Sequence, residues 1–364
     1  MKVAILYGGK SGEHEVSLIS AGSVVRNIRK EHKLNLIGIA KNGTWYLQPD
    51  SVLENAREGD GPLQLKTDCP AVVIVPGSGL RVYSSFGSSD LQVEAVFPVL
   101  HGTFGEDGTI QGLLECAGLA YVGADVLGSA IGMDKEVAKN LWCNAGLPTV
   151  PSLSVTAGDN LETRLTDAKK RVEESFGWPA FVKPARAGSS VGASRVATPE
   201  AFNQAAKAAF AYDTKILVEP FMTARELECS VIGNDEPRAF EPGEIIPSHE
   251  FYDYEAKYID PDGARLVIPA ALDQDTRTHI KNLAVQAYRT AKLSGMARID
   301  FFMDKKDGTI YLNEANTIPG FTHISMFPKM CEAGGLPYPE LIEELLDLAR
   351  ARKKSKDLLR YDYT

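Results

Sequence analysis

Cysteine is scarce in this sequence, and its five cysteines follow no ordered spacing. Their number is odd and none belongs to a CxxC pair, which argues against a disulfide framework and against a cysteine-based zinc site. The histidines show no metal-binding spacing either. We therefore expect free thiols in a reducing cytosol, and a cytoplasmic protein.

Long apolar runs and blocks of basic residues are also missing. No apolar run approaches the ~20 residues that a membrane-spanning helix needs. The net charge is −9, so neither a nucleic acid nor an anionic membrane is an expected partner. The N-terminal stretch MKVAILYGGKSGEHE leads too quickly into charged residues to be a signal peptide, and it predicts a first β-strand instead.

The composition that remains is that of an ordinary globular protein. With 364 residues, 44% of them hydrophobic, we expect two or three domains. The first third alternates between strands predicted at 2–9, 71–77 and 93–102, a helix at 15–32 and a hairpin at 36–48. This alternation predicts an α/β domain with a mostly parallel sheet. Such sheets bind ligands at the carboxyl ends of their strands, so the loops GGKSGEHE and HGTFGEDGT are candidate site loops.

The pattern changes after a helix predicted at 127–145, which Gly146 and Pro148 should end. Short strands then mix with segments of other kinds: helices at 160–176, 199–211 and 274–294, a hairpin at 297–316 and a charged C-terminal helix. The polar segment 247–264 is too long for a tight turn, and loops of this length are usually lids or disordered. We predict three domains of α/β (α+β) class, at 1–124, 125–216 and 217–364.

The first candidate loop, residues 8–15, suggests an anion site but not a P-loop. The P-loop pattern requires a glycine where this chain has Ala4. A strand that ends in two glycines before a helix still offers free backbone N–H groups to an anion. Glu13, near the helix start, is either the partner of a substrate ammonium group or a capping carboxylate that is favourable with the helix dipole.

The stretch FVKPARAGSSVG (181–192) allows two interpretations. GSSVG matches the nucleophile elbow of serine hydrolases, but that motif needs a strand, a sharp turn and then a helix. The β-like ASRVATP follows instead, so the loop is predicted to lie between two strands. Its N–H groups and hydroxyls could then fold over phosphates as a flap, and Lys183 would add a positive charge.

The hairpin at 297–316 predicts a metal site. A five-residue turn at 304–308 would place one set of side chains on a common face: Arg298, Asp300, Phe302, Leu312, Glu314 and Asn316. Asp300 and Glu314 would be diagonal neighbours, roughly 7–8 Å apart at the backbone. Hard oxygen donors without histidine or cysteine suit Mg²⁺, and Arg298 could stabilise developing negative charge. A surface ion-pair ladder is the alternative, but it accounts only for Arg298 with Asp300.

The motifs together resemble a known family. GGKSGEHEVS, HGTFGEDGTIQG, MDK, VKPARAGSSVG, FYDYEAKY, ARID and NEANTIPGFT follow one another from residue 8 to residue 322. Their order resembles that of the D-alanine–D-alanine ligases of the ATP-grasp superfamily, over essentially the whole chain. The resemblance implies a three-domain ATP-grasp fold. It also implies ATP-dependent joining of two D-alanines through a D-alanyl phosphate, for peptidoglycan precursor synthesis.

The resemblance also implies a role for each matching residue. The residues expected to act on D-alanine or in catalysis are Glu13, His101, Ser189, Lys257, Tyr258, Arg298, Gly320, Ser325 and Met326. Glu13 would hold the ammonium group of the first D-alanine, with Ser189 orienting it and His101 bordering it. Arg298 and the N–H of Gly320 would stabilise the oxyanion. Ser325 and Met326 would seat the second carboxylate, and Lys257 and Tyr258 would lie on the lid.

The residues expected at ATP are Lys135, Lys183, Ser189, Ser190, Glu219, Met222, Glu226, Lys257 and Phe302. Lys135 and Lys183 would reach the phosphates. Glu219 and the backbone near Met222 would bind adenine, and Glu226 the ribose hydroxyls. Two Mg²⁺ ions, for which Mn²⁺ can substitute, would be held by Asp300, Glu314 and Asn316. A monovalent cation activates many members of the family.

The chain departs from the family's pattern at Ala187, where some members carry an acidic residue in the flap. Tyr258 is retained on the lid, which favours a dipeptide product over D-alanyl-D-lactate. A D-alanine–D-lactate ligase, or another ATP-grasp carboxylate–amine ligase, remains the alternative. The resemblance implies a homodimer with D-alanine and ATP as substrates.

Overall fold

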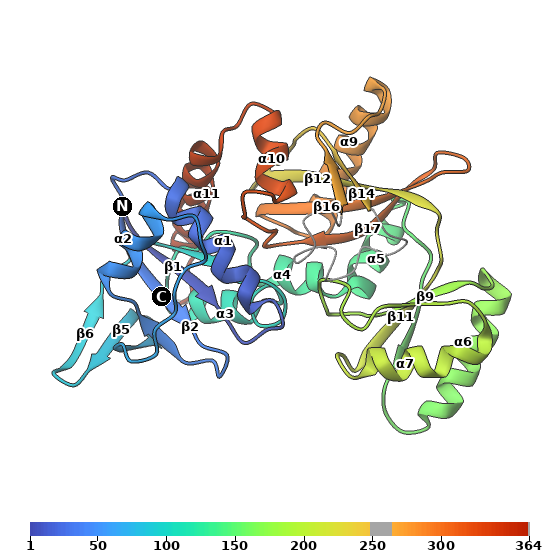
Figure 1. Ribbon diagram of the computed structural model, residues 1–364, viewed down its shortest axis with the longest axis horizontal. Coiled ribbons are helices and arrows are strands. Elements are labelled where there is room, and N and C mark those ends of the chain that lie inside the picture. Colours follow the sequence, from blue (N-terminus) through green and yellow to red (C-terminus); the bar gives the residue numbers. More distant parts are fainter. Residues whose placement is uncertain (248–263, 363–364) are drawn as a thin grey trace.

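Three β-sheets follow one another along the described part of the chain (Figure 1). The computed structural model describes residues 1–247 and 264–362. Most of the predicted lid, 247–264, therefore lies outside the described residues, together with Lys257 and Tyr258. Within the described ranges, we find no helix long and apolar enough to cross a membrane. The α/β class agrees with the prediction, while the domain boundaries at 124 and 216 stay predictions.

The first sheet has the strand order β6-β5-β4-β3-β2-β1-β7. Its strands are β1 (Lys2–Gly8), β2 (Lys33–Ile39), β3 (Trp45–Leu47), β4 (Ala71–Val75), β5 (Gly79–Ser84), β6 (Gly87–Leu91) and β7 (Ala95–Val99). Strand β1 pairs in parallel with β2 and β7, but the pairs from β2 to β6 are antiparallel. The prediction of a mostly parallel sheet was therefore wrong for the part of the sheet from β2 to β6. The β2–β3, β4–β5 and β5–β6 connections are too short for a parallel crossover.

Strand β1 is a continuous apolar run because both of its faces are buried. Val3, Ile5 and Tyr7 join one core cluster, whereas Ala4 and Leu6 join the other. Helices α1 (His14–Asn27), α2 (Asp50–Glu58) and α11 (Tyr338–Asp357) contribute to the first cluster, and α3 (Thr109–Cys116) to the second. Helix α1 ends earlier than the predicted residue 32, because Ile28 is already extended.

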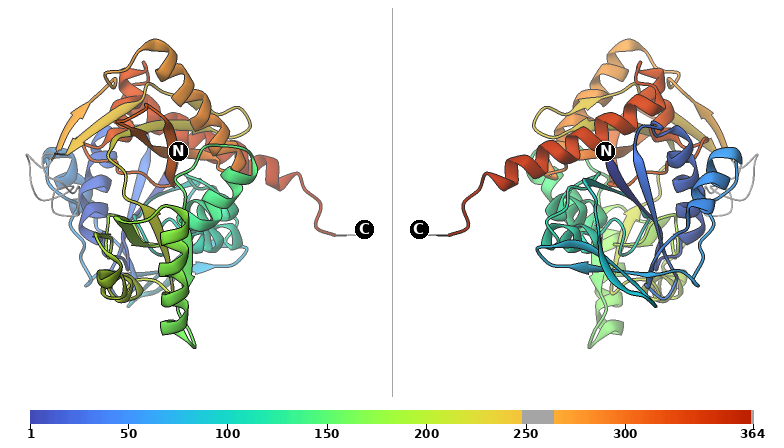
Figure 2. Two further views of the ribbon diagram at one scale, coloured as in Figure 1. Left: turned by 90° about the vertical axis from the view of Figure 1, so that its right-hand side faces the viewer. Right: turned by 90° about the vertical axis from the view of Figure 1, so that its left-hand side faces the viewer.

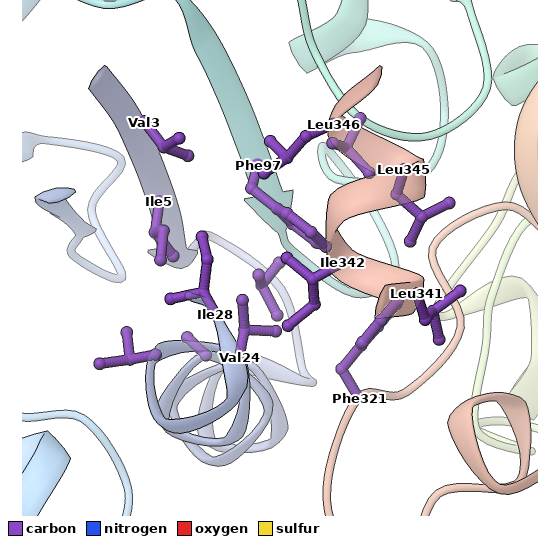
Figure 3. Close-up of a cluster of buried hydrophobic side chains, with 14 of the residues drawn as sticks. Val3, Ile5, Val24, Ile28, Phe97, Phe321, Leu341, Ile342, Leu345 and Leu346 are labelled. Carbon is purple, nitrogen blue, oxygen red and sulfur yellow. The ribbon is translucent and has the colours of Figure 1, made fainter. Parts of the chain in front are cut away.

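Helix α11 attaches the end of the chain to its beginning. Its Leu341 and Ile342 pack in one cluster with Val24 of α1 and Phe97 of β7 (Figure 3). Figure 2 shows α11 lying against the first sheet, with residues 358–362 extending away from the body. The first and third parts of the sequence therefore share a core.

The second sheet is antiparallel, with the order β10-β9-β11-β8. Its elements are β8 (Leu153–Thr156), β9 (Ala180–Pro184), β10 (Ser194–Val196), β11 (Lys215–Pro220), α6 (Leu161–Ser175) and α7 (Phe202–Phe210). Leu165, Val172 and Phe202 bring the two helices onto the buried side chains of β9 and β11. The helices predicted at 160–176 and 199–211 are confirmed.

The third sheet has the order β15-β14-β12-β16-β17, with β13 paired to β12. Its elements are β12 (Ala224–Gly233), β13 (Arg238–Ala239), β14 (Gly243–Pro247), β15 (Ala264–Val267), β16 (Gly295–Asp304), β17 (Ile310–Asn316), α9 (Gln274–Thr290) and α10 (Met326–Ala333). Asp273 caps α9 by accepting a hydrogen bond from the N–H of Thr276 at 2.8 Å. The predicted helix at 274–294 is confirmed, but it ends at Thr290.

The helix predicted at 127–145 is two helices, α4 (Val126–Met133) and α5 (Lys135–Asn144). The break is at Asp134, whose backbone is extended and whose carboxylate caps α5 at the N–H of Val137. Lys215 of β11 donates to the same carboxylate at 2.7 and 2.8 Å. The local pattern does not reveal this tertiary contact. Lys135, the next residue, donates to the carbonyl of Ala187 between β9 and β10.

Candidate active site

The two loops predicted from the ends of the first-sheet strands meet in space. Strands β1 and β7 are parallel neighbours, so their carboxyl ends open on the same edge. Ser11 Oγ, after β1, donates to the carbonyl of His101, after β7, at 2.8 Å. A Cβ atom on Gly102 would lie 2.4 Å from Glu13 Oε2, and Gly102 has φ +72°. Only glycine lets the second loop approach Glu13 this closely.

Glu13 points toward the flap and does not cap its helix. It occupies the N-cap position of α1, but its side chain makes no capping hydrogen bond to the described backbone of that helix. Its Oε1 instead accepts a hydrogen bond from Ser189 Oγ. The side chain of Glu13 therefore does not act as a capping acceptor, and its role at a substrate stays a prediction.

The flap between β9 and β10 is held in an unusual backbone conformation. Ser189 and Ser190 have φ values of 51° and 57°, the left-handed region that non-glycine residues seldom adopt. Such conformations cost of order 1–3 kcal/mol and persist where surrounding contacts impose them. The strand β10, and not a helix, follows the loop. This geometry excludes the nucleophile elbow and agrees with a flap.

His101 is buried and lies 4.0 Å from the largely buried Glu106, between Nδ1 and Oε1, and the charge of Glu13 acts on both. The His101 ring lies 3.0 Å from the Ile318 carbonyl through Nδ1 and 3.1 Å from Ser20 Oγ through Nε2. Burial lowers the pKa of His101, so the neutral ring donates to Ile318 and accepts from Ser20. Burial, with the charge of Glu13, raises the pKa of Glu106 to about 8. Sequence reasoning missed Glu106, although it lies within the HGTFGEDGT motif.

The two lysines predicted at the phosphates both lie near the third sheet. Lys135 Nζ donates to the Ala187 carbonyl in the flap at 2.8 Å and lies 3.3 Å from Glu314 Oε2. Lys183 Nζ lies 2.8 Å from Glu219 Oε2 and donates to Asn313 Oδ1 at 3.1 Å. The structure therefore brings the flap, the MDK turn and the predicted metal hairpin together.

Glu219, predicted at adenine, is held between two lysines. Lys139 Nζ lies 2.9 Å from its Oε1, opposite the contact of Lys183 with Oε2. Burial would raise the pKa of Glu219, but the two ammonium groups outweigh it and hold the pKa below its usual value. Met222 lies in the connection from β11 to β12, and Glu226 of β12 is paired with Phe302 of β16.

The hairpin β16–β17 forms as predicted, but with a different register. Asp300 lies directly opposite Glu314, and a bulge follows between Asp300 and Phe301, so that Phe301 pairs with Leu312. Leu312 therefore faces the buried core, and its predicted place beside Glu314 was wrong. The bulge leaves Asn313 as the extra residue, and this residue meets Lys183. A bulge depends on packing, which explains why turn counting missed it.

The predicted metal ligands lie together with Arg298. Asn316 Nδ2 donates to Asp300 Oδ2 at 2.9 Å. Arg298 bonds both carboxylate oxygens of Asp300, at 2.8 and 2.7 Å, and lies 3.1 Å from Glu228. Within the described ranges, no cluster of three or more His, Cys, Asp or Glu residues suits a metal ion. Two opposed carboxylates and an amide oxygen nevertheless fit a hard cation such as Mg²⁺.

The residues predicted at the second carboxylate surround the start of α10. Ser325 is the N-cap residue of α10, and its Oγ bonds both the N–H and the hydroxyl of Thr322, at 3.0 and 2.8 Å. A Cβ on Gly320 would lie 2.7 Å from Ser325 Oγ, so a larger residue would disturb this turn. The Met326 side chain is buried with Ile245. Met326 would therefore bind a ligand through its backbone N–H at the start of α10.

Comparisons with known proteins agree with this geometry. Sequence models described as D-ala D-ala ligase N-terminus and D-ala D-ala ligase C-terminus match residues 2–124 and 141–347. The D-alanine–D-alanine ligase of Treponema denticola is 52% identical over 358 residues, which are 98% of this chain and 97% of the relative. That of Thermoanaerobacter pseudethanolicus is 47% identical over 351 residues, which are 96% of each chain.

Solved structures agree as well. The D-alanine–D-alanine ligase of Coxiella burnetii has a TM-score of 0.82 at 35% identity, over 98% of this chain and 97% of that one. The D-Ala:D-Ser ligase VanG of Enterococcus faecalis has a TM-score of 0.81 at 35% identity, over 96% of this chain and 99% of that one. The two family models together cover most of the chain, and the relatives match it over nearly its whole length. The chain therefore belongs to the D-alanine–D-alanine ligase family of ATP-grasp enzymes.

Proposed function

We propose that this protein joins two D-alanines to D-alanyl-D-alanine in the cytoplasm, with conversion of ATP to ADP and phosphate, for peptidoglycan precursor synthesis. The contact between Ser189 and Glu13 is the observation that supports it most directly. It connects the loop that would cover the phosphates to the carboxylate that would bind the substrate ammonium group. The carboxylate of the first D-alanine would then lie between Glu13 and the phosphates under the flap, beside the phosphoryl group that it must accept.

The first step activates a carboxylate. Glu13 pairs with the ammonium group of the first D-alanine, and one carboxylate oxygen of that substrate attacks the γ-phosphorus of ATP. The new P–O bond forms as the bond to ADP breaks, which gives D-alanyl phosphate. Lys135 and Lys183 neutralise the charge of the transferring group, and positioning of this kind dominates phosphoryl transfer. Water would hydrolyse the acyl phosphate, so Lys257 and Tyr258 are assigned to a lid that excludes it.

The second step forms the peptide bond. Ser325 and the N–H of Met326 hold the carboxylate of the second D-alanine. Its amine nitrogen then attacks the acyl carbon. The tetrahedral oxyanion is stabilised by Arg298 and the N–H of Gly320. Collapse of this intermediate breaks the C–O bond and releases phosphate, and the amine loses its proton.

The hairpin is assigned to the metal ions. Asp300, Glu314 and Asn316 would hold two Mg²⁺ ions, for which Mn²⁺ can substitute. The contact of Lys135 with Glu314 supports this assignment, because it marks a position that attracts positive charge. A divalent cation bound there would neutralise the phosphates of ATP. We also propose activation by a monovalent cation.

The nucleotide is assigned to the space between the second and third sheets. Glu219 and the backbone at Met222 would bind adenine, Glu226 the ribose, and Phe302 would contact the nucleotide, with Ser190 in the flap. We also propose the domain limits 1–124, 125–216 and 217–364, and a homodimer.

Phosphate release tests the proposed function. The protein is incubated with Mg·ATP and D-alanine, L-alanine or no amino acid, and the product is identified by mass spectrometry. Release that depends on D-alanine, together with D-alanyl-D-alanine, is the expected result. Equal release with and without D-alanine would overturn the substrate assignment.

A second candidate differs only in the second substrate. The similarity to a D-Ala:D-Ser ligase makes D-serine a necessary competitor, and D-lactate is the depsipeptide alternative. Retention of Tyr258 supports the dipeptide. Competition between D-alanine, D-serine and D-lactate at equal concentrations, with D-alanine as the first substrate, separates these products.

A further inference from the structure

Lys139 is a buried charged group to which the proposed mechanism gives no role. It lies on α5, one turn after Lys135, and its side chain is 3% exposed. Its Nζ lies 2.9 Å from Glu219 Oε1 and donates to the carbonyl of Val150 at 3.2 Å. With its ammonium group enclosed by these partners, Lys139 does not reach into the site.

The partner of Lys139 is also the partner of a phosphate lysine. Glu219 forms an ion pair with Lys139 at one oxygen and with Lys183 at the other, and Lys183 also donates a hydrogen bond to Asn313 on the bulge. The four side chains come from α5, β11, β9 and β17, and so link the second sheet to the third. Their positions fix Lys183 from two directions.

The charge of this group is unbalanced. Two ammonium groups share one carboxylate, and the side chains of Lys139, Lys183 and Glu219 are 3%, 10% and 3% exposed. Burial lowers the pKa of Lys139 to about 8; the nearby charge of Lys183 acts in the same direction, and the charges of Glu219 and Glu314 oppose it only in part. An anion bound at Lys183 would relieve this imbalance, because opposite charge favours the protonated form of a lysine.

We propose that Lys139 is a positioning residue for nucleotide binding: through Glu219 it holds Lys183 in place and supplies the surplus positive charge that the phosphates of ATP neutralise. The proposal rests on the function proposed above for its ATP site. It goes beyond that function because none of the proposed steps uses Lys139.

The experiment measures nucleotide affinity directly, by calorimetric titration of the full-length protein with Mg·ATP. Lys139→Met removes the charge and keeps the length of the side chain, and we expect about a tenfold or greater rise in Kd. This is the size expected when a buried charge-assisted contact loses one partner. In turnover, the KM for ATP should rise by a similar factor while the KM for D-alanine changes less than twofold. Lys139→Arg should restore most of the affinity.

Two further variants separate positioning from simple structural support. Lys281→Met removes a lysine of α9 that lies outside the proposed site, where its Nζ is 2.6 Å from Glu241 Oε1. This variant should leave the ATP affinity unchanged. If Lys139 acts through Glu219, Lys139→Met should have less than a twofold effect in a Glu219→Gln background, because the two changes then affect one interaction. Lys139→Gln, which can still donate a hydrogen bond, provides a second uncharged variant should Lys139→Met fold poorly.

Several results would overturn the inference. These are an unchanged Kd for Mg·ATP in both uncharged variants, an equal rise in the KM values of both substrates, or the same effect of Lys139→Met in both backgrounds. If the wild-type protein binds ATP but forms no dipeptide, the proposed substrate is wrong. The titration still decides the role of Lys139 in that case.

Discussion

The hydrogen bond from Ser189 to Glu13 leads to a prediction that separates the two substrates. Ser189→Ala removes the hydroxyl that fixes the Glu13 carboxylate and leaves the rest of the flap in place. Both side chains are partly buried. Hydrogen bonds to charged groups contribute about 1.5–3 kcal/mol. We take the lower end because of the partial exposure, which corresponds to about a tenfold change in binding.

The assay couples ADP release to NADH oxidation, with D-alanine titrated at saturating ATP and ATP titrated at saturating D-alanine. Ser189→Ala should raise the apparent KM for D-alanine about tenfold. Because Ser189 is also expected at ATP, its KM for ATP should rise as well, but by a smaller factor. The matched variant is Ser190→Ala, because Ser190 has the same left-handed backbone and any effect on flap strain should be shared. Since Ser190 is assigned to ATP alone, its variant should change the KM for ATP and not that for D-alanine.

The reasoning fails if Ser189→Ala leaves the KM for D-alanine within twofold of the wild-type value. It also fails if both variants raise the KM values of both substrates equally, because the effect would then belong to the flap backbone. The thermal midpoints of both variants should stay close to that of the wild type.

The remaining predictions concern the metal, the buried acid and the lid. Glu314→Gln should lower kcat at least a hundredfold, since removing a proposed charged metal ligand weakens stabilisation of the transferring phosphoryl group; near wild-type turnover would contradict the metal assignment. Treatment with EDTA should abolish phosphate release, and added Mg²⁺ should restore it. The pKa of Glu106 is raised to about 8 in the folded protein from an ordinary value of 4.5, so its contribution to stability is fully present below the unfolded value and is lost as the pH rises toward 8. The free energy of unfolding of Glu106→Gln minus that of the wild type should therefore increase from about pH 5 to about pH 8. If denaturant titrations show a difference that stays constant over this range, this carboxyl is not the source of the pH dependence. Tyr258→Phe should raise the use of D-lactate relative to D-alanine, and unchanged product ratios would remove Tyr258 from the specificity argument.

Much of the site could be predicted from sequence because it depends on where strands end and on which side chains alternate. Two glycines after a buried strand placed Glu13 at the edge of the first sheet, and β-like residues after GSSVG distinguished a flap from an elbow. The alternation of Arg298, Asp300 and Phe302 predicted the metal face of β16. These signals are local, since strand periodicity and turn residues act over a few positions.

Contacts between distant segments decided the rest. The bulge that sets Asp300 opposite Glu314 and presents Asn313 to Lys183 follows from how β16 and β17 pack, and turn length alone suggested another register. The break at Asp134 depends on Lys215, and the buried position of Lys139 depends on Glu219. The sequence by itself determined which groups are proposed to carry the chemistry. Only the tertiary structure decided their pairing, because burial and charge partners arise from segments that are far apart along the chain.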